Sequence, residues 1–141
     1  MSIEEIEVRR AARKEGIAKA RREQYETDIV EVDKLEVEFG DDRVSVLETS
    51  SFVQGLPTVV VVKTPAEDYF KRYRHKARKA RKQNGTVDTL AMGDAADELA
   101  ECCIVYPADK ETYARMKTEW PSIHDNAIAE AVRLGEAKGK D

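Results

Sequence analysis

The chain has 141 residues, of which 41% are hydrophobic, 37% are charged and 6% are aromatic. A chain of this size is expected to form one domain, or one domain with an appendage. It buries enough surface to fold without a disulfide bond or a structural metal ion. No apolar run approaches the roughly 20 residues that a membrane helix needs, and the first residues lack the basic start and apolar stretch of a signal peptide. We therefore predict a cytoplasmic protein with no membrane segment and no cofactor.

The formal net charge of −4 is distributed unevenly along the chain. Residues 1–63 carry −4 (10 basic, 14 acidic), residues 64–83 carry +6 (8 basic, 2 acidic) and residues 84–141 carry −6 (6 basic, 12 acidic). The middle block is thus a basic island in an acidic protein. The two cysteines, Cys102 and Cys103, are neighbours, which is a poor geometry for a structural disulfide, so we expect reduced thiols.

The first part of the chain is predicted to be a helix followed by a β-meander. Ser2 and Glu5 form a capping box, and helix-favouring residues continue to about Tyr25. From Asp28 the apolar residues alternate, which predicts a strand, and Gly40-Asp41-Asp42 predicts a hairpin turn. The first strand would contain Val30, Val32, Leu35, Val37 and Phe39, the second Val44, Val46 and Leu47, and the third Thr58 to Val62.

Four helices are predicted after this meander. Thr64-Pro65-Ala66-Glu67 supplies an N-cap hydroxyl, a first-turn proline and a glutamate, and this helix is expected to stop near Gln83, before Asn84-Gly85. The others are expected over residues 87–105, from an Asp109 cap to Trp120, and from a Ser122 cap to Leu134, with a frayed tail after Gly135. Their predicted inward residues are Leu90, Leu99, one of Cys102 and Cys103, Val105, Tyr113, Met116, Trp120, Ile123, Ala127, Ile128, Ala131 and Leu134.

These elements predict an α+β fold. An N-terminal helix and a small antiparallel three-stranded sheet would occupy residues 1–63, and a helical part of about four helices would occupy residues 64–141. The change of composition at Thr64 is the expected boundary between the two subdomains.

The helix after Thr64 carries the most conspicuous chemistry in the sequence. It could neutralise phosphates while Tyr69, Phe70 and Tyr73 stack on bases. The same aromatic residues also have the spacing of a helix core, and the cations would equally suit a surface that faces acidic protein. Both interpretations stay open, with protein ranked before nucleic acid. The cations are Lys71, Arg72, Arg74, Lys76, Arg78, Lys79, Arg81 and Lys82.

No motif in the sequence indicates catalysis. The two histidines, His75 and His124, do not lie in a metal-binding pattern, and Cys102-Cys103 lacks the spacing that lets two sulfurs converge on one zinc. The sequence contains no phosphate-binding loop and no nucleophile elbow. We therefore predict a protein that is not an enzyme and holds no metal.

Two segments resemble the tail assembly chaperones of long-tailed bacteriophages and related prophages. The first is Val60-Val-Val-Lys-Thr-Pro-Ala-Glu-Asp-Tyr-Phe-Lys-Arg, and the second is Leu99-Ala-Glu-Cys-Cys-Ile-Val-Tyr-Pro-Ala-Asp. A short helix, a Trp-Pro break and a last helix follow between Asp109 and Leu134, as they do in that family. The resemblance covers about residues 58–135.

The resemblance implies a protein that binds the tape-measure protein, keeps it soluble and helps to recruit tail-tube subunits. Such a chaperone needs an exposed strip of aromatic residues flanked by charged residues, and the helix after Thr64 offers one. We expect that truncating Phe70 or Tyr73 weakens client binding with little loss of stability. The alternatives are a nucleic-acid-binding accessory protein acting through residues 71–82 and a structural tail component, and homo-oligomers are left open. The predicted partner-binding residues are Phe70, Lys71, Tyr73, Arg74, Ala77 and Arg78.

Overall fold

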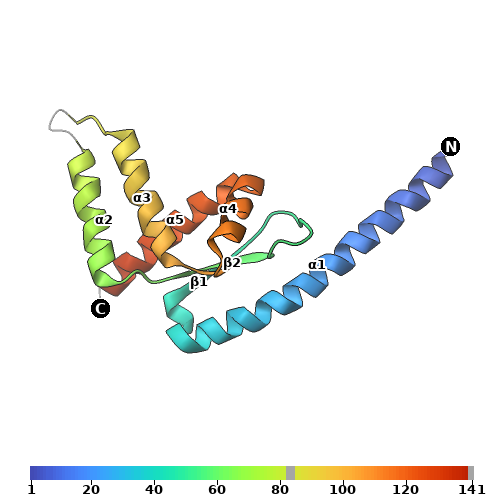
Figure 1. Ribbon diagram of the computed structural model, residues 1–141, viewed down its shortest axis with the longest axis horizontal. Coiled ribbons are helices and arrows are strands. Elements are labelled where there is room, and N and C mark those ends of the chain that lie inside the picture. The colour runs from blue at the N-terminus through green and yellow to red at the C-terminus, as the bar shows by residue number, and fades with distance from the viewer. Residues whose placement is uncertain (82–84, 140–141) are drawn as a thin grey trace.

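A three-stranded antiparallel sheet separates a long N-terminal helix from four shorter helices (Figure 1). The structure is a computed structural model in which residues 1–81 and 85–139 are described. The predicted α+β class is confirmed. The elements in chain order are α1 (Ile3–Phe39), the short 3-10 helix η1 (Asp41–Arg43), β1 (Val44–Glu48), β2 (Val59–Lys63), α2 (Glu67–Ala80), α3 (Thr89–Cys103), β3 (Ile104–Tyr106), α4 (Lys110–Glu119) and α5 (Pro121–Gly139).

The central strand β2 is buried on both faces, which explains its unbroken run of valines. It pairs with β1 from Val44 opposite Lys63 to Glu48 opposite Val59, and with β3 on its other edge. Val59 and Val61 pack against Val32 of α1, whereas the alternate valines of β2 join the core formed by the helices. The sheet is therefore the middle layer of three.

The expected hairpin before β1 is wrong, because residues 28–39 continue α1. Ser2 caps this helix as predicted, its hydroxyl accepting a hydrogen bond from the backbone N–H of Glu5. Gly40, with φ of 96°, ends it. The alternation that suggested a strand came in part from Val30 and Val37, which are 53% and 79% exposed. The residues of this segment that face the sheet are Asp28, Val32, Leu35 and Phe39, at helical spacing.

The sheet does have three strands, but the third comes from a segment predicted as helix. Residues Ile104 to Tyr106 leave α3 and pair antiparallel with Val61 and Val62 of β2. Val105, expected to face inward from a helix, therefore lies in this strand. The segment that supplies the third strand lies beyond the boundary predicted at Thr64.

Several predicted helix ends move by a few residues. Thr64 does not cap α2; its hydroxyl donates to the carbonyl of Arg43, and the helix starts after Ala66, whose side chain cannot cap. The helix ends at Ala80, and the predicted stop at Gln83 and Asn84 lies outside the described residues.

The last helices follow the predicted pattern closely. Asp88 caps α3 and Asp109 caps α4 through their carboxylates. Helix α5 begins at Pro121, so Ser122 lies inside it, and the helix continues through Gly135 to Gly139 rather than fraying. Leu90 is 75% exposed instead of buried. The predicted core residues that are buried in these helices are Leu99, Cys103, Tyr113, Met116, Trp120, Ile123, Ala127, Ala131 and Leu134.

Candidate protein-binding site

A groove of about 360 Å³ runs between α2 and α5 and contains most of the predicted site. Its floor is apolar, its α2 side is cationic, and Glu136 lies on the α5 side. We call it the α2–α5 groove. A second hollow of about 260 Å³ adjoins it through Phe70 and Arg74 and also includes Lys71 and Lys138. The residues that line the α2–α5 groove are Phe70, Tyr73, Arg74, Ala77, Arg78, Arg81, Val132 and Glu136.

Phe70 fixes the position of α2 against α5. Its side chain is 9% exposed and belongs to the main hydrophobic core. A Cβ atom built on Gly135 would lie 2.7 Å from two atoms of the Phe70 ring. The ring can therefore occupy this position only because residue 135 has no side chain. Phe70 is therefore not exposed as the docking strip requires, because its ring is part of the packing between the two helices.

Tyr73 and Ala77 remain available at the groove surface. Both are half-buried, and the Tyr73 ring stacks on Phe70 with 6.1 Å between ring centroids. They lie one turn apart on α2 and face Val132 of α5 across the groove. An apolar side chain of a partner that enters here would contact a tyrosine ring and two small aliphatic side chains.

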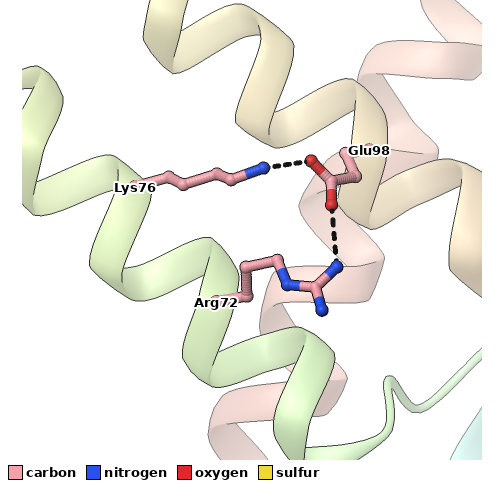
Figure 2. A network of polar contacts seen from close by, with 3 residues as sticks. All are labelled: Arg72, Lys76 and Glu98. Carbon is pink, nitrogen blue, oxygen red and sulfur yellow. Dashed lines mark hydrogen bonds and ion pairs between the residues drawn. The ribbon is translucent and has the colours of Figure 1, made fainter.

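One side of α2 uses its cations within the fold. Figure 2 shows Arg72 and Lys76 reaching from α2 to Glu98 of α3, at 3.4 Å and 2.5 Å. These two hydrogen-bond donors, Lys76 first, lower the pKa of Glu98 below its ordinary value. Lys71 likewise pairs with Glu67 one turn earlier, at 2.9 Å, and lowers the pKa of that carboxyl. The basic run is thus partly a clamp between α2 and α3.

The other side of α2 presents three arginines without an anionic partner. Within the described ranges 1–81 and 85–139, Arg74, Arg78 and Arg81 have no carboxylate within 4.0 Å. The Arg74 guanidinium lies 4.8 Å from the centroid of the Phe70 ring, which holds it at the groove edge. Their planar donors match carboxylate or phosphate oxygens.

The structure thus brings all six predicted site residues together on the face of α2 that turns towards α5. Their role in binding stays a prediction. The α5 side of the site, Val132, Gly135 and Glu136, was missed. It lies more than fifty residues away in sequence, and no local pattern relates it to α2.

Asp28 is a buried carboxylate that sequence analysis assigned to a strand. It is fully buried and accepts hydrogen bonds from the backbone N–H and hydroxyl of Thr58, at 2.7 Å and 2.6 Å, from Tyr106 and from Gln24. Burial and the bond to Asp28 raise the pKa of Tyr106. Four donors satisfy the charge, so this cluster ties α1 to β2 and β3 rather than forming a reactive site.

His124 and the two cysteines have structural surroundings rather than those of a reactive site. His124 of α5 bridges Tyr113 of α4 and Asp97 of α3, with 2.8 Å on each side. Burial raises the pKa of Tyr113 to about 12, so its hydroxyl is not a poised nucleophile. Cys103 is buried and Cys102 is half-buried, and both are free thiols.

Over residues 1–81 and 85–139, no three His, Cys, Asp or Glu side chains are placed to hold a metal ion together. No helix in the same part of the chain has the length and apolar character needed to cross a membrane. Comparison with known proteins adds no relative: no family model, no curated protein and no solved structure matches the chain.

Proposed function

We propose that the chain is a phage tail assembly chaperone, a non-enzymatic protein that binds the tape-measure protein in the host cytoplasm and helps to recruit tail-tube subunits. The resemblance of residues 58–135 to that family suggests the client. The α2–α5 groove carries the structural part of the proposal, because it combines an apolar floor with three unpaired arginines.

A client helix with one apolar stripe and a flanking acidic edge fits this groove. Its apolar side chains would cover Tyr73, Ala77 and Val132, and its carboxylates would accept hydrogen bonds from the arginines. Such a site suits transient binding of a long helical protein, since one short segment of the client occupies one groove.

The test is co-expression with the tape-measure protein encoded in the same genome. We expect a higher soluble yield of that protein and co-elution of the two chains. Arg78→Glu should weaken the complex at least about tenfold, the loss typical of an interface hot spot. Lys79→Glu is the matched control, because it makes the same charge change at the next position, outside the groove. An unchanged soluble yield without a complex would end the chaperone proposal.

Nucleic acid is the second candidate ligand, because the same three arginines could bind phosphates. Such binding should fall steeply with salt, with a slope of about −0.7 to −0.9 per phosphate contact. We expect only weak binding of single-stranded DNA or RNA at physiological salt. Tight, salt-sensitive binding that is lost in a chain carrying Arg74→Glu, Arg78→Glu and Arg81→Glu would reverse the order of the two candidates.

A further inference from the structure

The long helix α1 contains two successive blocks whose net charges are equal in magnitude and opposite in sign. Residues 9–22 contain seven basic residues and one acidic residue, a net charge of +6. Residues 23–38 contain one basic residue and seven acidic residues, a net charge of −6. The boundary between the blocks falls between Arg22 and Glu23, near the middle of the helix.

The cations of the basic block form no ion pair with any of the described residues. Residues 3–19 are exposed throughout, and Figure 1 shows this part of α1 extending away from the sheet and the other helices. In the part of the chain that the structure describes, none of the seven cations from Arg9 to Arg22 has a carboxylate within 4.0 Å, and the single ion pair within α1 is Lys34 with Glu31. The basic block therefore remains open to an external partner, and so do the exposed carboxylates of the acidic block, Glu23, Glu26, Asp33 and Glu38.

We infer that this partner is a second copy of the chain, bound through an antiparallel pair of α1 helices. An antiparallel pair centred between residues 22 and 23 places residues 9–22 of each copy beside residues 23–36 of the other. The basic block of each copy, with a net charge of +6, then lies beside the acidic block of its partner. A parallel pair would place each block against itself. A foreign helix would need the same charge pattern in reverse, whereas a second copy has it already.

The pairing face is a stripe of α1 that flanks its buried, sheet-facing side. Asp28 and Val32 are buried against the sheet, so the partner helix must lie along another side. Tyr25 and Ile29 lie on this stripe and are 41% and 39% exposed, and Ala18 lies two turns before Tyr25. Ala18 and Tyr25 also line a hollow beside Glu48 of β1 and Thr58. In the antiparallel arrangement residue 18 of one copy is level with residue 27 of the other. The small side chain of Ala18 therefore lies between the larger side chains of Tyr25 and Ile29 of the second copy. The overlap of about 28 residues spans roughly 42 Å.

Sedimentation equilibrium of the full chain tests the association. We expect a dimer whose dissociation constant rises about tenfold or more between 0.05 M and 1 M NaCl, because salt screens exposed charges. A chain that stays monomeric at millimolar concentration in low salt, or a dimer insensitive to salt, would overturn the inference.

Two charge-reversed chains sharpen the test. Arg13→Glu, Lys14→Glu and Arg22→Glu together bring the basic block from +6 to 0. Glu26→Lys, Asp33→Lys and Glu36→Lys together bring the acidic block from −6 to 0. Each chain alone should dimerise at least about tenfold more weakly than the natural chain. Mixed together they retain one fully complementary half, so the heterodimer should be tighter than either homodimer, and a mixture that gains nothing would contradict charge pairing.

The orientation is measured with a spin label. Ala12→Cys in a Cys102→Ser background offers one reactive thiol, because the remaining Cys103 is buried and burial raises its pKa to about 12. Residue 12 of one copy is level with residue 33 of the other, so the antiparallel pair separates the two labelled positions by about 32 Å along the axis. A parallel pair would bring them to about 10 Å, the spacing between packed helices, and that distance would refute the proposed orientation.

Discussion

Helix α2 and the basic block of α1 are both cationic but use their charge in different ways. Helix α2 carries six basic and two acidic residues, a net charge of +4, and Glu67 and Glu98 neutralise part of it within the fold. The basic block of α1 carries +6 and meets no carboxylate within the described residues. A run of cations thus has different meanings according to its neighbours, and only cations left without acids are candidates for binding.

The two helices also differ in what anchors them. Helix α2 packs on α5 through the Phe70 ring at Gly135, whereas α1 meets the sheet through the Asp28 carboxylate in addition to Val32. An apolar anchor and a polar anchor should respond differently to truncation, and the following substitutions measure that difference.

Phe70→Ala should have the largest effect. Loss of a buried phenyl ring should lower the free energy of unfolding by about 3–5 kcal/mol, measured by urea denaturation. Tyr69→Ala is the control, because Tyr69 is the preceding residue on α2 and is 41% exposed, and it should change stability by less than about 1 kcal/mol. Equal losses in the two variants would contradict the placement of Phe70 in the core.

Asp28→Ala should cost about 2–3 kcal/mol, because it leaves the buried N–H of Thr58 and other donors without their acceptor. Hydrogen exchange should show the loss concentrated in residues 23–39 and at the start of β2, where the contacts are made. Asp33→Ala removes the same carboxylate from an exposed position of the same helix and should be within about 0.5 kcal/mol of the natural chain. Uniform protection in Asp28→Ala would show that the carboxylate is not the anchor.

Gly135→Ala should destabilise by about 1–3 kcal/mol, because the new methyl group overlaps the Phe70 ring. Gly93→Ala is the matched control in α3, where a Cβ meets nothing within 4 Å, and it should stabilise by about 0.5–1 kcal/mol. Adding Phe70→Leu to Gly135→Ala should cost less than the two separate losses combined. Strict additivity would mean that the ring and the glycine are not in contact.

High pH should produce the smallest effect. Burial raises the pKa of the Cys103 thiol from 9.0 to about 12, so between these values the unfolded chain releases a proton that the folded chain keeps. The contribution of Cys103 to the free energy of unfolding should therefore be constant below about pH 9 and fall above it. Cys103→Ala should make the fall between pH 9 and 10 shallower, measured by denaturant titration at closely spaced pH values. An unchanged slope would place the cause elsewhere.

The sequence predicts those elements whose signals are local. Ser2 and Asp109 fall where helices begin, and the core stripe of α5 has clear helical spacing. The end of α1 was hidden because its buried face contains a carboxylate, Asp28, which an apolar template does not count. Strand β3 was hidden because three residues carry too little pattern, and because their pairing with β2 is a contact across forty residues.

The candidate site shows the same division. The α2 side, including Tyr73, Arg74 and Arg78, follows from one helix face and was predictable. The α5 side of the site was not predictable from the sequence. The face of α5 that packs on α2 is set by the contact between Phe70 and Gly135, which forms only in the folded chain. The charge pattern alone also did not reveal which cations of α2 are neutralised, since Glu98 becomes their neighbour only in the fold.

We propose that the two unpaired basic surfaces bind different partners: the α2–α5 groove binds the client and the basic block of α1 binds a second copy. Two double variants test it together. Arg74→Glu with Arg78→Glu alters the groove, and Arg13→Glu with Arg22→Glu alters α1, with the same change of net charge.

The decisive measurement is the affinity of each variant for a labelled helical fragment of the tape-measure protein, set beside its dimer dissociation constant in the same buffer. We predict that the groove variant loses at least about tenfold in client affinity and keeps its dimer, and that the α1 variant does the reverse. If either variant lowers both affinities to the same extent, the two surfaces are one interface and the account is wrong.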